Sequence, residues 1–589
     1  MKKEKPFLQM SVYLTILLLS SCISSPPIQN EVIVHQSNDP SMLNPVNFTD
    51  AGAGYITNHM FQLLMDLDFR NPEQVIPVLA ESRPQIEKTM DGKMLITYKL
   101  RQEARWDNGS PITAKDVEFS IKTIKCPLVN NPRAKPYFEF ITDFKFYEDD
   151  PLKFTIVSNQ IYILSEAASA EYAILPEYVY DPKGLLRNFT IKQIAEKGDS
   201  LKSNMQIKEF AEDFNSEKRA RDPHFISGSG PYKFTEWKTN ETIILTKKEN
   251  WWGDALRGQD NRQENCYFEA FPKKLIYRVI KDPTTALVSL KAGNIDVMRS
   301  IKTKDFYELS QSEKFTQNFY AYKPMIYGYT LIGINTKNPL LSDKITRQAL
   351  AHLVDVNKMI ETIKYGLAER VVGPVHPSKK KAYHTTIIPY SFNPEKAKTL
   401  LEKAGWKNTN NDATLDKLIN GKQTEFIIDF YFSAENEERK SIGLMLQQEA
   451  KKVGIKINII SSDGIVANSK YRKHEFDLMT DGRVVGPDPD DFKQTFHSES
   501  AADEGDNYFN FSNSEADALI DSIRTELNED KRRGMYHRFQ EILHEEVPLI
   551  FLWTPTERIA ISKKFENAYP STIKPGFWEQ GFKIITYSN

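Results

Sequence analysis

The chain has 589 residues, of which 40% are hydrophobic and 26% are charged, an ordinary composition for a soluble protein of about two to four domains. Its 77 basic and 79 acidic residues leave a net charge of −2. This balance indicates neither nucleic acid nor an anionic surface as a partner.

The first residues predict a secretory signal peptide over residues 1–21. Lys2, Lys3 and Lys5 form a positive region, and the apolar stretch from Phe7 to Leu19 is too short for a stable membrane anchor. We therefore expect this segment to be absent from the folded protein.

Leu19-Ser20-Ser21-Cys22 resembles a bacterial lipobox, in which the cysteine is lipidated and becomes the first mature residue. Each buried methylene of an acyl chain contributes about 0.8 kcal/mol, so lipid on Cys22 would hold the protein on a bacterial membrane, facing the periplasm or the exterior. Residues 22–30 would then be the lipidated cysteine and its tether. The alternative is an ordinary signal peptide with a chance cysteine at its end. Cys126 and Cys266 are expected to be free buried thiols rather than a disulfide.

Local patterns predict the first elements of the mature chain. A strand starts at Glu31, and the apolar residues from Ile56 to Leu67 are spaced as one helical face. Residues 94–100 alternate as a half-buried strand, and Thr113 is a good N-cap for the helix after it.

The stretch Ser227 to Gly253 predicts a tight loop and a hairpin. Glycines in SGSGP permit backbone angles that other residues resist, and two apolar runs flank the polar bend at residues 239–241. An aromatic pair, Trp251-Trp252, precedes the last glycine.

The second half of the chain alternates helices with strands. Asp282 and Pro283 start a helix, Ile345 to Ile363 form one apolar stripe closed by Gly366, and residues 455–459 alternate as a strand. Such units favour a mixed or largely parallel sheet with helices outside.

Several of these runs resemble signatures of the solute-binding proteins that serve peptide-type ABC importers, known as extracellular solute-binding protein family 5. They are SGPY with its following W-G, the run LRQEARWDNGSPITAKDV from Leu100, and the helix and strand after Asp282. The resemblance extends from about Glu31 to Trp553. It implies an α/β, two-lobed periplasmic-binding-protein fold of type II, large class, with mixed sheets, a hinge and an extra subdomain in the first lobe.

The resemblance also implies a division of the chain. Lobe I would comprise residues 31–72, 175–282 and 548–589, the extra subdomain residues 73–174, and lobe II residues 283–547. Because lobe I is discontinuous, at least two strands must cross between the lobes and act as the hinge of a closing cleft.

In this family a loop of lobe II supplies polar contacts to the ligand, with the pattern Gly, Trp, two variable residues, Asp, then Asp-Pro. Gly482 and Asp488-Pro489 match, but Arg483 replaces the Trp and Gly486 replaces the Asp that pairs with a peptide's α-amino group. An unpaired buried ammonium costs several kcal/mol. Either Asp481 or Asp488 therefore substitutes, or the ligand has no free amine there.

Other side chains are candidates for lining the cleft. Arg483 would suit a carboxylate or another anion if it points inward, whereas on the outer face of its strand it would be solvated. The remaining candidates are Ser229, Gly230, Tyr327, Asn335, His376, Tyr383 and Trp553. No metal or cofactor is expected, because His376 has no partner at useful spacing.

Catalytic motifs are missing from the sequence: it contains no Gly-x-Ser-x-Gly, no Walker phosphate loop and no His-Glu-x-x-His. We expect a monomeric binder rather than an enzyme. By resemblance it would be a lipoprotein that captures peptides and delivers them to the permease subunits of an ABC transporter. The alternatives are the same fold with a non-peptide, anionic solute, or a surface lipoprotein with an adhesive, chaperone or sensing role.

Overall fold

The computed structural model describes residues 30–585 except 132–133, 258–264, 435 and 503–504. The signal peptide and Cys22 lie outside the described residues, so both stay predictions. Within the described part, no helix combines the length and the apolar character needed to cross a bilayer.

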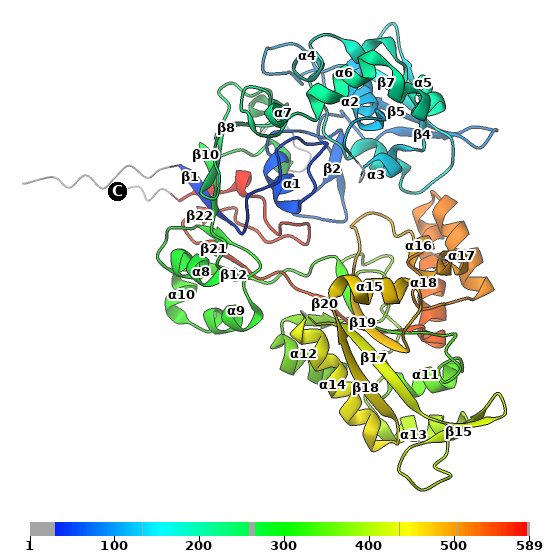
Figure 1. Cartoon of the computed structure of the whole chain (residues 1–589). Helices are drawn as coiled ribbons and strands as arrows, with labels where there is room; N and C mark the ends of the chain where they lie inside the picture. Colours follow the sequence, from blue (N-terminus) through cyan, green and yellow to red (C-terminus); the bar gives the residue numbers. More distant parts are fainter. Residues whose placement is uncertain (1–29, 132–133, 258–264, 435, 503–504, 586–589) are drawn as a thin grey trace, which may run out of the picture.

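Lobe I is built on a mixed sheet (Figure 1) in which β1 runs parallel to both of its neighbours. The spatial order of the seven strands is β12 (Phe319–Tyr322), β21 (Ile559–Ser562), β11 (Val297–Met298), β1 (Glu31–Gln36), β10 (Lys274–Val279), β9 (Thr242–Lys247) and β8 (Tyr232–Lys238). The predicted hairpin is thus confirmed as β8 and β9, which pair antiparallel at one edge of this sheet.

Helices and two small hairpins complete lobe I. Its core holds residues of α4, α5 and α6 together with Phe119 of the subdomain. The elements are α1 (Ala51–Thr57), α4 (Glu177–Tyr180), α5 (Ile191–Lys197), α6 (Met205–Phe214), α7 (Glu217–Arg221), α8 (Pro283–Lys291), α9 (Thr303–Ser310), α10 (Glu313–Asn318), and the pairs β2 (Met65–Leu67) with β3 (Val75–Pro77) and β22 (Phe565–Glu566) with β23 (Lys583–Ile584).

The extra subdomain is an antiparallel four-stranded sheet with two helices. Its strands lie in the order β4 (Gln85–Lys88), β5 (Met94–Lys99), β7 (Lys153–Ser158) and β6 (Ile141–Phe146), and its helices are α2 (Ala114–Lys125) and α3 (Ser165–Ala170). The Asp116 carboxylate accepts a hydrogen bond from the Thr113 backbone N at 2.8 Å, at the predicted helix start.

Lobe II has a mixed six-stranded sheet in which β17 runs parallel to β18 and β19, and β13 runs antiparallel to β19 and β20. The strand order is β14 (Ala368–Arg370), β20 (Leu549–Pro555), β13 (Gly328–Ile334), β19 (Leu478–Val484), β17 (Ile427–Ser433) and β18 (Lys456–Ser462). Its other elements are α11 (Lys344–Ala351), α12 (Val356–Lys364), α13 (Pro394–Lys403), α14 (Glu437–Lys452), α15 (Gly464–Arg472), α16 (Lys493–Phe496), α17 (Ser514–Thr525), α18 (Glu529–Glu546) and the hairpin β15 (Asp416–Ile419) with β16 (Lys422–Glu425).

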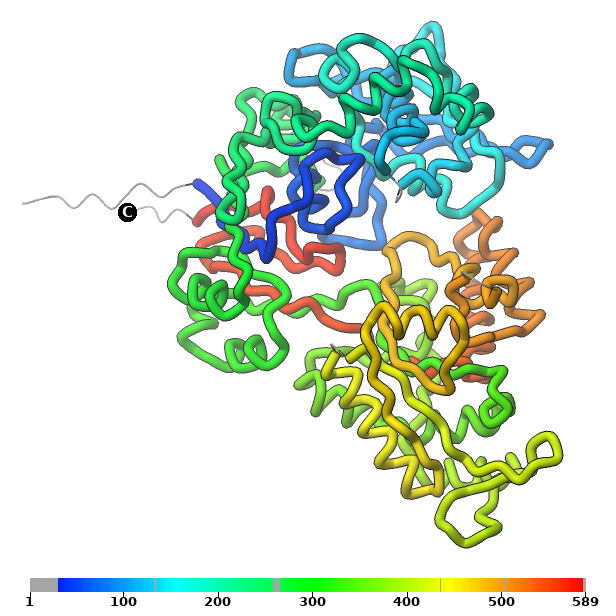
Figure 2. Tube along the Cα trace, viewed as in Figure 1, coloured from blue at the N-terminus to red at the C-terminus, as the bar shows by residue number. Residues whose placement is uncertain are grey.

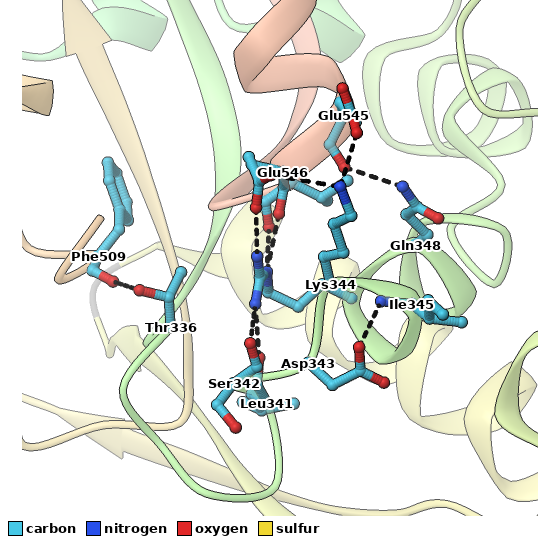
Figure 3. Close-up of polar contacts among 12 residues, drawn as sticks. Thr336, Leu341, Ser342, Asp343, Lys344, Ile345, Gln348, Phe509, Glu545 and Glu546 are labelled. Carbon is cyan, nitrogen blue, oxygen red and sulfur yellow. Dashed lines mark hydrogen bonds and ion pairs between the residues drawn. The ribbon is translucent and has the colours of Figure 1, made fainter. Parts of the chain in front are cut away.

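Polar contacts fasten the end of α18 to α11 (Figure 3). Lys344 Nζ lies 2.6 Å from Glu545 Oε1, and Gln348 Nε2 donates to the Glu545 carbonyl at 2.8 Å. Arg347, only 4% exposed, donates to the backbone carbonyls of Leu341, Ser342, Glu546 and Val547. These contacts fix the point where the chain leaves α18 and enters β20.

Two helix predictions differ from the structure. The expected helix from Ile56 to Leu67 ends at Thr57, because the backbone beyond it bonds to distant segments: Leu64 N donates to Ala170 O at 3.1 Å, and residues 65–67 form β2. The apolar stripe at 345–363 belongs to two helices, α11 and α12, and Asp355 caps the second by accepting from Lys358 N at 3.0 Å. Tertiary hydrogen bonds and a local cap outweigh helical spacing here.

The strands also differ from the expected division of the chain. Strands β11 and β12 pair within the lobe I sheet, although residues 283–547 were expected in lobe II. Strand β20 pairs with β13 and β14 in lobe II, although residues 548–589 were expected in lobe I. An apolar strand pattern specifies which faces are buried, not which sheet the strand joins.

Two adjacent segments connect the sheets, residues 323–327 and 556–558, and form the hinge (Figure 2). Ile326 N donates to Pro555 O at 3.0 Å, and Glu557 N donates to Pro324 O at 2.8 Å. Met325 and Thr556 form an antiparallel bridge between them. Because the two segments are bonded to each other, rotation of the lobes must bend them together.

Candidate interlobe binding site

A cavity of about 490 Å³ lies between the lobes. The β2–β3 hairpin and α3 wall it on the lobe I side, while residues 379–382, residues 487–490 and the first two turns of α18 wall it on the lobe II side. Its volume falls within the range of roughly 300 to 1,000 Å³ typical of small-molecule sites. The wall changes when the lobes move, because both contribute to it.

Charged residues of both signs line the cavity. The basic ones are Arg83, Lys379, Lys381, Arg532 and Arg533, and the acidic ones are Glu73, Glu166, Glu171, Asp488, Asp490, Glu529 and Asp530. Apolar side chains such as Met65, Leu67 and Ile163 fill the spaces between them. A wall of this kind suits a ligand that carries both charges.

Two carboxyl groups of the wall, Glu171 and Asp488, lie close together, with Asp66 behind them. Glu171, at the end of α3, lies within side-chain hydrogen-bonding reach of Asp488 of lobe II. Burial, followed by the Asp488 and Asp66 carboxylates, raises the pKa of Glu171, and burial raises the pKa of Asp488. Burial, opposed by the Tyr267 hydroxyl, raises the pKa of Asp66 to about 6. Two carboxylates cannot bond to each other when both are ionised, so a hydrogen bond between Glu171 and Asp488 requires that they share one proton.

The charge of Lys379, on the lobe II side, acts on both Asp488 and Asp490. Its Nζ donates to Asp490 Oδ1 at 2.7 Å and to the Asp488 carbonyl at 2.5 Å. Asp490 is buried, and its Oδ2 has no partner among the described residues. The Lys379 side chain therefore forms its ion pair with Asp490, and the side chain close to the Asp488 carboxyl group is that of Glu171.

The loop after β19 brings only one predicted residue to the cavity, Asp488. Asp481 instead pairs with Arg439 at 2.8 Å, and Gly482 is exposed beside the same arginine. Of the two acids that could replace the missing Asp at Gly486, Asp488 is the one within the wall.

Arg483 has its own partners outside the cavity. Its Nη2 donates to the Asp506 carbonyl at 3.2 Å, and its guanidinium lies 4.3 Å from the centre of the Tyr508 ring. Arg483 is half-buried and does not belong to the cavity wall.

Tyr327 and His376 lie together next to the hinge, behind Lys379. Their rings are 4.5 Å apart, and His376 Nε2 lies 3.0 Å from Thr554 Oγ1. Burial, followed by the Lys379 charge, lowers the pKa of His376 to about 4, so this imidazole is neutral at pH 7. Both side chains are buried and lie outside the cavity wall.

The other predicted residues serve as scaffold in this structure. Trp553 is 1% exposed in the core of lobe II, and half-buried Tyr383 packs against the aromatic cluster there. Asn335 donates to the carbonyls of His474 and Phe476, at an open recess on lobe II away from the cavity wall.

Ser229 and Gly230 hold lobe I together. The Ser229 carbonyl accepts from the indoles of Trp251 and Trp252 at 2.8 and 3.1 Å. A Cβ on Gly230 would lie 2.6 Å from the His59 carbonyl, so the backbones approach here as only glycine permits. The motif is thus a packing feature.

Sequence reasoning missed most of the cavity wall. Lys379 and Lys381 stand in the run Ser378-Lys379-Lys380-Lys381, a basic signal next to the His376 loop that could have been noticed. Glu171 carries no local signal, since only the fold brings it to Asp488. No group of three or more metal-ligating side chains suited to an ion is present in the part of the chain that the structure describes.

The family model for bacterial extracellular solute-binding proteins, family 5 Middle, matches residues 74–504. The chain belongs to this family. Among curated relatives, the oligopeptide-binding protein AppA of Bacillus subtilis (strain 168) is 26% identical over 587 residues, covering 96% of each chain. The nickel-binding periplasmic protein of Escherichia coli (strain K12) is 25% identical over 507 residues, covering 84% of each.

Solved structures of family 5 proteins share the fold. Bacillus subtilis AppA in complex with a nonapeptide aligns with a TM-score of 0.63 at 24% identity, covering 94% of this chain and 99% of that one. HbpA2 from Haemophilus parasuis aligns with a TM-score of 0.72 at 19% identity, covering 94% and 100%. The predicted resemblance and the two-lobed α/β fold are confirmed.

Proposed function

We propose that this family 5 protein captures peptides in the interlobe cavity and delivers them to the permease subunits of an ABC importer. The observation that carries the proposal is the cavity between the lobes, whose wall holds the Glu171–Asp488 pair and separate basic side chains. The relation to an oligopeptide-binding protein along 96% of both chains supports peptide as the cargo.

Asp488 is the proposed partner of the peptide's α-ammonium group. An ammonium that replaced the proton shared by Glu171 and Asp488 would let both carboxyl groups ionise beside a cation. On the lobe II side, Lys381, Arg532 and Arg533 provide donors suited to a carboxylate of the same peptide. Binding would then favour the closed form by contacting both lobes at once.

The envelope location is part of the proposal. Lipid on Cys22 would anchor the protein as a monomer at the membrane, with residues 22–30 as tether, so that captured cargo stays near the permease. The role is binding without catalysis. The alternative of a non-peptide, anionic solute drew its support from the missing Asp at Gly486 and from Arg483. Arg483 instead contacts Asp506 and Tyr508, which removes the second ground.

Native mass spectrometry of the purified protein, under gentle and then denaturing conditions, tests the cargo. A ladder of released masses spaced by amino-acid residues is expected. A single non-peptide mass, such as a metal complex, would contradict the proposal and favour a cargo of the kind named for the nickel-binding relative.

Titration calorimetry tests the amine contact with one peptide and its N-acetylated form. Acetylation removes the ammonium, so binding should weaken by at least about tenfold, the equivalent of roughly 1.4 kcal/mol. Equal affinities would show that the acidic pair does not recognise the amino terminus.

A further inference from the structure

The subdomain contacts lobe II directly, beside the cavity, through the segment between β7 and α3. Ile163 N donates to the Arg524 carbonyl at 2.9 Å. The Ile163 side chain packs in a buried cluster of lobe II, and Leu527 of lobe II packs against the subdomain core. Each part thus inserts an apolar side chain into the other.

A polar cluster accompanies this exchange. Tyr162 OH donates to Asp491 Oδ2 at 2.7 Å, and Arg524 Nε donates to the same oxygen at 2.9 Å. The guanidinium of Arg524 also lies 5.1 Å from the centre of the Tyr162 ring. A single carboxylate oxygen therefore joins a subdomain phenol to a lobe II arginine, in the strong class of charge-assisted hydrogen bonds.

The lobe II side of this cluster is held by contacts within lobe II. Asp491 Oδ1 accepts from Lys493 N at 3.0 Å, and Arg524 lies in the last turn of α17. Asp491 and Arg524 are thus held by lobe II alone, so that only Tyr162 and Ile163 have to arrive. Burial, followed by the Asp491 carboxylate, raises the pKa of Tyr162, which keeps its hydroxyl a donor.

The cluster lies away from the hinge, where the subdomain meets α16 and α17 (Figure 1). The covalent connections between the lobes instead run from β12 to β13 and from β20 to β21. Rotation about that hinge would separate Tyr162 from Asp491. None of Tyr162, Asp491 and Arg524 belongs to the cavity wall, so cargo cannot replace their contacts.

We propose that Tyr162, Asp491 and Arg524 form an interlobe latch that stabilises the closed conformation and thereby sets cargo affinity without touching the cargo. The apparent affinity of a cargo that binds only the closed form is proportional to the fraction of closed molecules, so it falls as that fraction falls. The effect on affinity rests on the proposed function, whereas the effect on closure does not.

Electron paramagnetic resonance distances test the latch in the full chain without ligand. Spin labels at Lys145→Cys on β6 and Lys422→Cys on β16, in a chain that also carries Cys22→Ser, report the separation of the subdomain and lobe II, since both positions are exposed and Cys126 and Cys266 are buried. Tyr162→Phe and, separately, Arg524→Met should shift the ratio of open to closed molecules about tenfold toward open, as expected for losing one hydrogen bond to a charged group.

Tyr147→Phe is the matched control, because its hydroxyl lies 3.0 Å from Thr155 Oγ1 within the subdomain. It should leave the distances unchanged. Thermal unfolding checks that each variant is folded, and Arg524→Met replaces Tyr162→Phe if the latter is not.

Peptide affinity separates the two proposals. Longer distances together with weaker peptide binding support the latch and the cargo assignment. Longer distances in a protein that binds no peptide support the latch and overturn the cargo assignment. Unchanged distances in both folded variants overturn the latch, whatever the protein binds.

Discussion

Glu171 and Asp488 face each other across the interlobe cavity, one from the end of a subdomain helix and the other from a loop of lobe II, and their side chains lie within hydrogen-bonding reach. Because they come from different lobes, opening of the lobes would separate them, and a hydrogen bond between them needs one proton between two acids. Closure, proton uptake and ligand binding therefore share the same atoms.

The first prediction concerns pH. Because the folded-state pKa of Glu171 is raised above its ordinary 4.5, the folded protein retains a proton that the unfolded chain has released, and stability falls as pH rises through this interval. Between about pH 6.5 and pH 9, above the titration of Asp66, the Tm should fall less in Glu171→Gln than in the wild type. Thermal unfolding at several pH values measures both slopes, and parallel slopes would refute the shared proton.

The second prediction separates Asp488 from Asp481. Asp488→Asn removes the carboxylate proposed to hold a peptide's ammonium, so the Kd should rise by at least about tenfold. Asp481→Asn alters a pair with Arg439 outside the cavity wall and should leave the Kd unchanged. Calorimetry with one peptide compares the two variants. A larger rise in Kd for Asp481→Asn would show that Asp481, not Asp488, holds the peptide's amino group.

Arg483 provides the third prediction. Since its guanidinium contacts Asp506 and Tyr508 and not the cavity, Arg483→Met should leave the affinity for both peptides and small anions unchanged. Thermal-shift titrations with each ligand class measure this. Selective loss of anion binding would restore the non-peptide alternative.

The fourth prediction concerns the stability of lobe II. Arg347→Met removes the buried donor of four backbone carbonyls, two of them in buried hydrogen bonds, and the free energy of unfolding should fall by about 3 kcal/mol. Lys344→Met removes a more exposed ion pair on the same helix and should cost much less. Urea denaturation compares the two variants, and equal losses would mean that the carbonyl contacts contribute little.

Gly230 and Gly534 form the fifth comparison. A Cβ on Gly230 would clash with the His59 carbonyl, so Gly230→Ala should lower the free energy of unfolding by about 1–3 kcal/mol. Gly534 is exposed in α18 with open space around it, and Gly534→Ala should stabilise the protein by about 0.5–1 kcal/mol. Urea denaturation measures the change in the free energy of unfolding for both variants. An unchanged free energy of unfolding in Gly230→Ala would show that the two backbone segments can move apart.

The sequence by itself determined several local elements and the family. The hairpin after Pro231, the cap at Asp282 and the matched runs depend on neighbouring residues, whose backbone preferences act in any context. The fold class followed from these runs because they are spread along most of the chain.

Only the tertiary structure decided which residues face the ligand cavity. Glu171 meets Asp488 through the docking of two lobes, and Trp553, expected in the cleft, is buried because β20 joins the lobe II sheet. The sequence pattern shows whether a side chain is apolar or charged. Which residue that side chain contacts depends on long-range strand pairing and on lobe closure, and the energies of both come from contacts between residues hundreds of positions apart.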